Sequence, residues 1–146
     1  MKITSARLGQ VDIDPAKILT FPDGIIGFPD LKRYILLPFV DDSPLQLLQA
    51  VDEPGLAFVV IDPLVFLAEY RLDLSAEDMA YLKAPDAAGL IVAVIVTIPE
   101  DPYKMTANLQ GPLVFNPETR LAKQVVNDPG TYPTRHAILA DNVEPT

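Results

Sequence analysis

The sequence predicts a mainly β protein, either a sandwich or a barrel, from the spacing of its prolines and its short apolar segments. Fifteen prolines are spread over 146 residues. Because proline breaks a helix interior, only the stretches after Pro63, Pro85 and Pro117 leave room for more than two helical turns, which excludes a helix bundle. Apolar segments recur between Pro, Gly, Asp and Asn residues, which is typical of all-β folds. With no linker or internal repeat, residues 1–146 are expected to form one domain.

Six short segments are predicted β-strands. In the first, Val11 and Ile13 alternate with polar residues, so one face of the strand is apolar. The last is almost continuously apolar and β-branched, and strands of this kind are usually buried on both faces, which predicts a central position in the sheet. The six segments are residues 9–13, 18–21, 33–39, 45–51, 56–61 and 90–98.

Helical signals are few. Ser75 followed by Asp78 resembles a capping box, which predicts a short helix over residues 76–83 that ends before Pro85. Residues 63–67 are predicted to form a single turn. Residues 116–126 are ambiguous: Asn116 and Pro117 suit either the start of a helix or a turn that leads into a strand, and local propensity does not decide between them.

Composition argues against several functional classes. A net charge of −9 disfavours direct binding to nucleic acid or to an anionic membrane, because phosphate contacts need clustered Lys and Arg. The chain has no cysteine, hence neither a disulfide nor a thiol nucleophile. No secretory signal is visible at the N-terminus, and the longest apolar run, 90–96, is too short for a membrane helix. We therefore expect a soluble cytoplasmic protein.

Residues that could carry catalysis or bind metal are scattered. The one histidine, His136, lies near the C-terminus and is expected to be an ordinary surface residue. Asp12 and Asp14 share a strand face, but Pro15 follows where a calcium loop needs glycine. No phosphate-binding glycine motif or serine-nucleophile motif occurs. The sequence thus predicts no enzyme activity, no cofactor and no metal.

Four stretches, read together, resemble the FliW family of flagellar assembly factors. They run in the family's order from near residue 10 to near residue 136, and they depart from its pattern at Ala50, at Phe115 and at Gly111, where alanine is usual. The stretches are ILTFPDGIIGFP at 18–29 followed by Tyr34, LLQA at 47–50, AFVVIDP at 57–63 with Tyr70 downstream, and MTANLQGPLVFN at 105–116 with Lys123, Gln124 and Tyr132 beyond.

The resemblance implies a small, single-domain, barrel-like fold of antiparallel strands that works by binding and not by catalysis. It implies two partners in the cytoplasm, flagellin and the translational repressor CsrA, which exchange on the factor so that flagellin synthesis follows export. The negative charge suits a basic RNA-binding partner, and we expect a monomer when no partner is bound. The barrel also favours a hairpin turn at 116–119 with a returning strand at 120–126.

Asn108 and Gln110 are the first candidates for partner contact. They are polar positions in an otherwise apolar run and lie two residues apart, so they share one side of an extended chain. Their side chains could recognise the backbone of a partner. Alternatively, they could form internal hydrogen bonds that close the barrel.

Two further groups are candidates. Ile25, Ile26 and Phe28 form an apolar cluster that could dock a partner helix, or could instead fold onto the core. Glu69, Tyr70 and Asp73 combine an aromatic ring with acids, which suits a basic partner, although an ordinary strand is an alternative.

A different function, binding of a small apolar molecule inside the barrel, remains as an alternative. It requires an open internal cavity. We expect Phe58, Phe66 and Phe115 to fill the interior instead.

Overall fold

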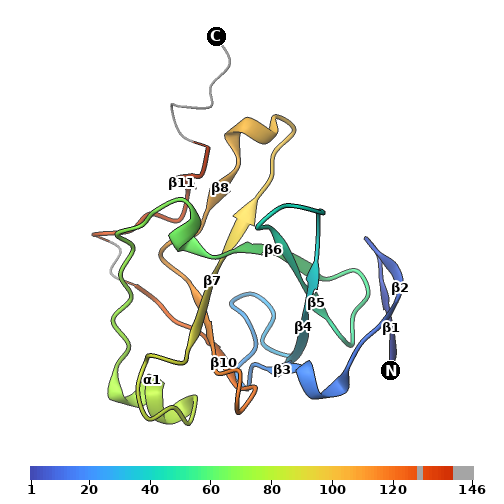
Figure 1. Ribbon diagram of the computed structural model, residues 1–146, viewed down its shortest axis with the longest axis horizontal. Helices are drawn as coiled ribbons and strands as arrows, with labels where there is room; N and C mark the ends of the chain where they lie inside the picture. Colours follow the sequence, from blue (N-terminus) through green and yellow to red (C-terminus); the bar gives the residue numbers. More distant parts are fainter. Residues whose placement is uncertain (128–129, 140–146) are drawn as a thin grey trace.

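The computed structural model describes residues 1–127 and 130–139, and Figure 1 shows it as a curled sheet with few helices. The predicted domain over 1–146 extends into residues outside these ranges. The strands are β1 (Lys2–Ser5), β2 (Gly9–Asp12), β3 (Leu19–Thr20), β4 (Arg33–Pro38), β5 (Gln46–Ala50), β6 (Ala57–Ile61), β7 (Ile91–Thr97), β8 (Thr106–Ala107), β9 (Leu113–Phe115), β10 (Ala122–Gln124) and β11 (His136–Ala137). The helices are α1 (Ala76–Tyr81) and three single 3-10 turns, Pro15–Lys17, Pro63–Val65 and Pro102–Lys104.

The main sheet is antiparallel and has the strand order β10-β9-β7-β6-β5-β4-β3. Its two edges approach each other, because Thr20 at the end of β3 forms a parallel bridge with Leu121, just before β10. The N–H of Thr20 donates to the carbonyl of Arg120 at 2.8 Å. The mainly β, barrel-like fold predicted by the sequence and the resemblance is therefore confirmed.

Strand β7 holds the centre of this sheet. It pairs with β6 along one edge, while its other edge pairs with β9 at Ile91–Ala93 and with β8 at Val96–Thr97. Ala93 and Val94, which point to opposite faces, are both buried. The predicted central position is confirmed, but burial on both faces holds only for the middle of the strand, since Ile91 is exposed.

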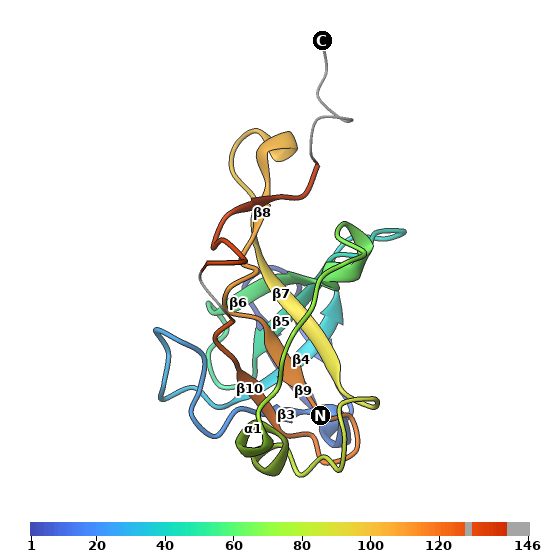
Figure 2. The same ribbon diagram turned by 90° about the vertical axis from the view of Figure 1, so that its left-hand side faces the viewer.

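Both faces of the sheet carry a hydrophobic core. The inner cluster includes Leu19, Tyr34, Leu48 and Val60. The outer face carries Leu47, Val59, Ile61 and Val94, packed against the β1–β2 hairpin and the segment that follows β6. A third cluster packs the end of α1 on β9 through Leu82 and Val114. Figure 2 shows the segment that leads from β6 to α1 crossing in front of β7.

The aromatic residues predicted to fill the interior lie on both faces of the sheet. Phe115 is buried in the inner cluster, and Phe58 packs against that cluster while half-buried. Phe66 was wrongly placed, because it packs against the outer face. The segment after β6 turns back across the outer face and carries Phe66 with it.

The ambiguous segment forms a turn and a strand. Asn116 donates its side-chain amide to the carbonyl of Leu82 at 3.0 Å, and its Oδ1 accepts from the N–H of Glu118 at 3.0 Å. Arg120 has a φ of 64°, a left-handed conformation that interrupts a helix. The returning strand is confirmed as β10, and the alternative helix over 118–126 is wrong.

The predicted short helix and the predicted strand at 18–21 are both present, but each is shorter than predicted. The helix ends at Tyr81, two residues early, and its capping box is confirmed: Ser75 Oγ accepts from the N–H of Asp78 at 3.0 Å, and the Asp78 carboxylate accepts from the N–H of Ser75 at 3.2 Å. The predicted strand at 18–21 is reduced to the two residues of β3. Strands β1, β8, β9 and β11 were not predicted, since short strands offer little periodicity to detect.

Candidate partner-binding site

The loop between β3 and β4 is shaped by two glycines in the left-handed region, Gly24 and Gly27. A Cβ on Gly24 would collide with the carbonyl oxygen of Phe28 and lie 2.7 Å from Cα of Pro29. Only glycine therefore allows the chain to return this tightly. The return is held by the N–H of Phe28, which donates to the carbonyl of Ile25 at 2.7 Å.

This turn separates the three apolar residues of the loop. Ile25 is buried in the inner cluster, as the core alternative predicted. Ile26, by contrast, is 69% exposed. Phe28 is also exposed, and its ring meets that of Phe58 edge-on at a centroid distance of 5.7 Å. Ile26 and Phe28 thus remain available for contact, whereas Ile25 anchors the loop.

The chain between β8 and β9 leaves the edge of β7 and forms a second loop. Asn108 keeps one backbone bond to β7, through its N–H to the carbonyl of Ile95 at 2.9 Å. Its Oδ1 accepts from the N–H of Gln110 at 3.1 Å and of Gly111 at 3.0 Å. The oxygen of Asn108 therefore has the internal role that the sequence left open. Its Nδ2 has no hydrogen-bond partner within residues 1–127 and 130–139.

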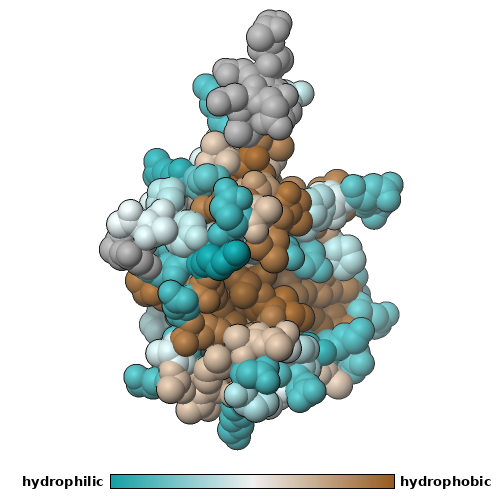
Figure 3. Space-filling view, turned by 60° about the vertical axis from the view of Figure 1, so that its left-hand side comes forward, coloured by the Kyte–Doolittle hydropathy of each residue, from teal (hydrophilic) through white to brown (hydrophobic). Residues whose placement is uncertain are grey.

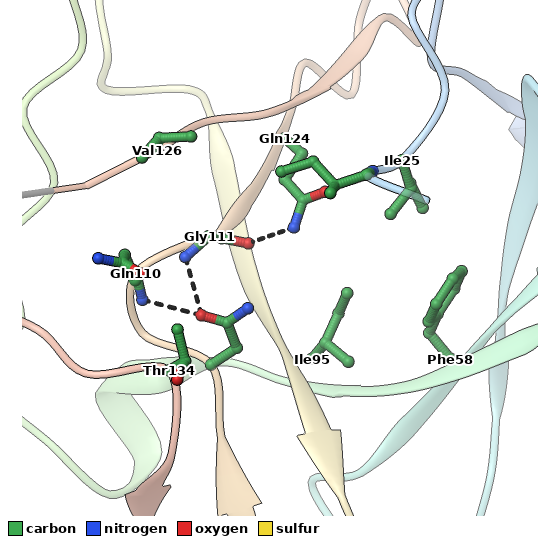
Figure 4. A pocket seen from close by; sticks show the side chains of 10 residues that line it. Ile25, Phe58, Ile95, Gln110, Gly111, Gln124, Val126 and Thr134 are labelled. Carbon is green, nitrogen blue, oxygen red and sulfur yellow. Dashed lines mark hydrogen bonds between the residues drawn. The ribbon is translucent and has the colours of Figure 1, made fainter. Parts of the chain in front are cut away.

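Gln124 of β10 connects the two loops. Its Oε1 accepts from the N–H of Ile26 at 2.8 Å, and its Nε2 donates to the carbonyl of Gly111 at 2.9 Å. Figure 4 shows this side chain between Gly111 and the loop that carries Ile25. The side chain bonds to both loops, so it holds the spacing between them.

Between the two loops lies a surface hollow of about 310 Å³, which we call the amide hollow. Figure 4 shows side chains from several strands and both loops around it. None of its lining residues within 1–127 and 130–139 is ionisable. They are the apolar Ile25, Ile26, Phe58, Ile95 and Val126, and the polar or small Asn108, Gln110, Gly111, Gln124 and Thr134.

A second hollow, of about 490 Å³, shares Phe58 and Ile95 with the first, and we call it the arginine hollow. It opens where the β6–β7 ladder stops at the Val59–Val96 pair. Arg7, from the turn between β1 and β2, lines it with its guanidinium 5.6 Å from the centre of the Phe39 ring. We refer to the two hollows together as the groove.

The segment after β6 buries one of its three candidate residues and exposes the other two. Tyr70 is 5% exposed, and its hydroxyl donates to the carbonyl of Leu109 at 2.8 Å and accepts from Nδ2 of Asn127 at 3.2 Å. Burial raises the pKa of this phenol to about 12. Glu69 and Asp73 are exposed. Tyr70 therefore does not contribute an exposed ring to a surface patch, and only the two acids of the predicted group face solvent.

A polar cluster fastens the loop between β3 and β4 to α1 and β10. The hydroxyl of Tyr81 donates to Asp23 at 2.8 Å, and Lys123 pairs with Asp78 at 2.7 Å while lying 5.0 Å from the centre of the Tyr81 ring. Burial, together with the bond to Asp23, raises the pKa of Tyr81 to about 12. These contacts attach the wall of the amide hollow to the rest of the fold.

Residues 2–138 match the family described as "FliW protein". The chain belongs to the FliW family. A curated relative from Natranaerobius thermophilus, named "Flagellar assembly factor FliW", is 41% identical over 142 residues, covering 97% of this chain and 94% of that protein. A relative of the same name from Geobacter sulfurreducens is 40% identical over 136 residues, covering 93% and 85%. The predicted resemblance is confirmed.

A solved structure agrees with this assignment. The chain is similar to the "Crystal structure of the flagellar assembly factor FliW" with a TM-score of 0.90 and 33% identity, covering 98% of this chain and all of that one. The curled sheet is therefore the fold of this family.

The structure brings together four of the predicted residues, Ile25, Ile26, Asn108 and Gln110, around the amide hollow. It places Phe28 beside Phe58, at the edge of that hollow, and it leaves Glu69 and Asp73 on a separate segment. Sequence reasoning did not single out Phe58, Ile95, Gln124 or Arg7 as contact residues. Gln124 is among the residues that carry the family resemblance and could have been found from it, whereas no feature of the sequence pointed to Arg7.

Three findings concern the other functional classes. His136 was described wrongly as an ordinary surface residue, because it is half-buried in β11 and its ring stacks on Phe66 at 5.8 Å. Among the described residues, no group of three His, Cys, Asp or Glu side chains is arranged to hold a metal ion. No helix in the same part of the chain is long and apolar enough to cross a membrane.

Proposed function

We propose that this protein is a non-enzymatic flagellar assembly factor that acts in the cytoplasm by binding flagellin and CsrA in exchange for one another. The observation that carries the proposal is family membership across almost the whole chain, with relatives at 40–41% identity that are named flagellar assembly factors. A protein that works by binding needs an accessible contact surface, and the groove provides one.

Exposed hydrophobic side chains support a binding role. Figure 3 shows hydrophobic residues gathered around a hollow near the middle of one face, with hydrophilic residues around them. Ile26 and Val126, which line the amide hollow, are 69% and 68% exposed. Large apolar areas left in contact with water are typical of protein interaction sites.

Charge supports the second partner. With 20 acidic and 11 basic residues, the protein attracts a basic RNA-binding protein over several ångströms and repels nucleic acid itself. The exposed acids Glu69 and Asp73 lie on a segment that has no part in the groove. They are proposed contacts for CsrA, and Ile26, Phe28, Asn108 and Gln110 are proposed contacts for flagellin.

The alternative of a small ligand held inside the barrel receives less support. The interior is occupied by side chains that are almost wholly buried, among them Leu19, Phe21 and Tyr34. The groove lies on the surface and suits a protein segment better than an enclosed molecule.

The proposal is tested by mixing the purified chain with flagellin and CsrA from the same bacterium. The free chain is expected to run as a monomer in size-exclusion chromatography and to form a complex with each partner. Added flagellin is expected to release CsrA from its complex. Failure to bind either partner would contradict the proposal, and simultaneous binding of both would contradict the exchange.

A further inference from the structure

We infer that the Asp23–Gly24 peptide is a site of spontaneous backbone isomerisation, and that the hydroxyl of Tyr81 restrains the reaction in the folded protein. The product is an isoaspartyl residue at position 23, in the loop between β3 and β4. This chemistry requires neither flagellin nor CsrA, and so it goes beyond the proposed function.

Asp23 and Gly24 form the only Asp–Gly pair in the sequence, which contains no Asn–Gly pair. Isomerisation begins when the backbone nitrogen that follows an aspartate attacks the side-chain carboxyl carbon of that aspartate. A glycine at the second position favours the attack, because it has no side chain to crowd the nitrogen and leaves the backbone free to turn. Position 23 is therefore the acidic residue at which an unfolded chain is expected to react fastest.

The reaction is a condensation followed by a hydrolysis. A bond forms between the nitrogen of Gly24 and the carboxyl carbon of Asp23, and one carboxyl oxygen leaves as water with the amide proton and the acid proton. The resulting succinimide ring then takes up one water at either of its carbonyl carbons. Hydrolysis at the main-chain carbonyl breaks the original peptide bond and leaves the chain connected through the side-chain carbonyl. The main chain thereby gains one methylene group.

The site borders solvent. Asp23 is exposed, and Asp23, Gly24 and Tyr81 all line a surface hollow of about 200 Å³. Solvent can therefore supply the water that opens the succinimide.

The folded structure holds both reacting groups in other hydrogen bonds. The N–H of Gly24 donates to the carbonyl of Phe21 at 2.8 Å, and the carboxylate of Asp23 accepts from the hydroxyl of Tyr81 at 2.8 Å. Ring closure turns the nitrogen and the carboxyl carbon towards each other, and both bonds oppose this movement. The Tyr81 ring is half-buried at the end of α1 and lies 5.0 Å from Nζ of Lys123, so Asp23 is not its only contact.

The added methylene would not fit the loop in its present conformation. The chain returns so closely after Gly24 that a Cβ on this residue would lie 2.7 Å from Cα of Pro29. The N–H of Ile26 donates to Oε1 of Gln124 at 2.8 Å. A longer main chain before Gly24 displaces these atoms from one another, so isomerisation should release Ile26 from Gln124.

The main test follows isoaspartate at position 23 by digestion and mass spectrometry during incubation at physiological pH and temperature. Tyr81→Phe keeps the ring beside Lys123 but removes the hydroxyl, and it is expected to react at least about threefold faster than the unmodified folded chain. In urea both chains are expected to react at the same rate, about tenfold faster than the folded unmodified chain, because unfolding frees both groups. Tyr103→Phe, at an exposed tyrosine outside this loop, is the matched control and is expected to leave the rate unchanged.

Two further measurements identify the site and its consequence. Asp23→Glu can still accept from Tyr81, but its longer side chain cannot close the succinimide ring, so no product is expected at position 23. The exposed Asp42, which precedes Ser43 in the turn between β4 and β5, is the internal reference and is expected to react more slowly than Asp23 in urea. Hydrogen exchange on the isomerised fraction is expected to be faster at the amide of Ile26.

The outcomes are decided on the purified chain alone. Equal rates in folded Tyr81→Phe and the folded unmodified chain, with folding checked by thermal melting, would show that the hydroxyl does not restrain the reaction and would overturn the inference. A rate at Asp23 in urea no higher than that at Asp42 would overturn it as well, whether or not Tyr81→Phe folds. Failure to bind flagellin or CsrA would contradict the proposed function and leave this inference standing.

Discussion

The loop between β3 and β4 and the segment between β6 and α1 both carry predicted contact residues. The loop exposes a large side chain to solvent, whereas the segment buries one. The loop leaves Ile26 69% exposed, whereas the segment buries Tyr70 to 5%. The loop is fastened by its backbone turn, by Gln124 and by the buried Ile25, which leaves the side chain of Ile26 free. The segment is fastened through Tyr70 itself. A residue becomes available for binding where other contacts, and not its own side chain, hold the chain in place.

The largest effect is expected for Tyr70→Ala. Loss of a buried aromatic side chain leaves a cavity and should destabilise the fold by about 3–5 kcal/mol. The free energy of unfolding in urea measures it. Ile26→Ala is the matched variant on the other region and should change stability by less than about 0.5 kcal/mol. Equal losses of stability at the two positions would contradict this difference between the loop and the segment.

A smaller loss is expected for Gly24→Ala, which tests backbone fastening in the loop. Gly24 has a φ of 69°, and a Cβ there meets backbone atoms that cannot move aside. The left-handed conformation alone costs about 1–2 kcal/mol, so the total should exceed about 2 kcal/mol. Gly27→Ala has a similar conformation but open space around its Cβ, so it should lose only the conformational part. Thermal melting of the pair would contradict this account if Gly27→Ala were the more damaging change.

The two polar atoms of the Asn108 side chain have different proposed roles, so substitutions can test internal hydrogen bonding and partner recognition separately. Asn108→Ala removes the acceptor for two backbone N–H groups and should cost about 1–3 kcal/mol of stability. Asn108→Asp keeps the acceptor but replaces the Nδ2 donor with a charge. It should remain stable while binding flagellin more weakly. Denaturation and calorimetry on both variants measure this, and an Asn108→Asp protein that binds normally would remove Nδ2 from the contact.

Alkaline pH should weaken the contact that fastens the segment. Burial raises the pKa of Tyr70 above its ordinary value of 10 to about 12, so the folded state holds this proton more tightly than the unfolded state. The stabilisation is complete below pH 10 and is lost as the pH rises towards 12. Tyr70→Phe removes the part of the pH dependence of stability that comes from Tyr70, while Tyr81 still contributes a similar part. Urea unfolding at pH 8 and pH 11 measures the difference, and an unchanged slope in Tyr70→Phe would contradict the assignment.

The smallest effect is expected for Gly111→Ala, which introduces the residue usual in the family. The new Cβ would lie 2.9 Å from Nε2 of Gln124, an atom at the end of a side chain and not of the backbone. Gln124 can shift slightly, so stability should change by less than about 1 kcal/mol. Melting temperatures of this variant and of Gly24→Ala compare the cost of a new Cβ that meets a side chain with the cost of one that meets the backbone. A loss as large as that of Gly24→Ala would show that Gln124 cannot yield.

Features that depend on local chemistry could be predicted from the amino-acid sequence alone. Proline spacing predicted a mainly β fold, Ser75 and Asp78 predicted the helix start, and the β-branched run at 90–98 predicted the central strand, because each signal acts within a few residues of itself. The motifs that identify the family are likewise contiguous. These predictions needed no knowledge of distant contacts.

Which side chains face the groove depends on contacts between residues that are distant in the sequence. Asn116 forms a turn because it bonds Leu82, 34 residues away, and Tyr70 is buried because Leu109 offers a carbonyl at the right place. Arg7 meets Phe39 only after the hairpin folds onto the sheet. Such contacts join residues far apart in the chain, and a propensity summed over neighbouring residues contains no information about them.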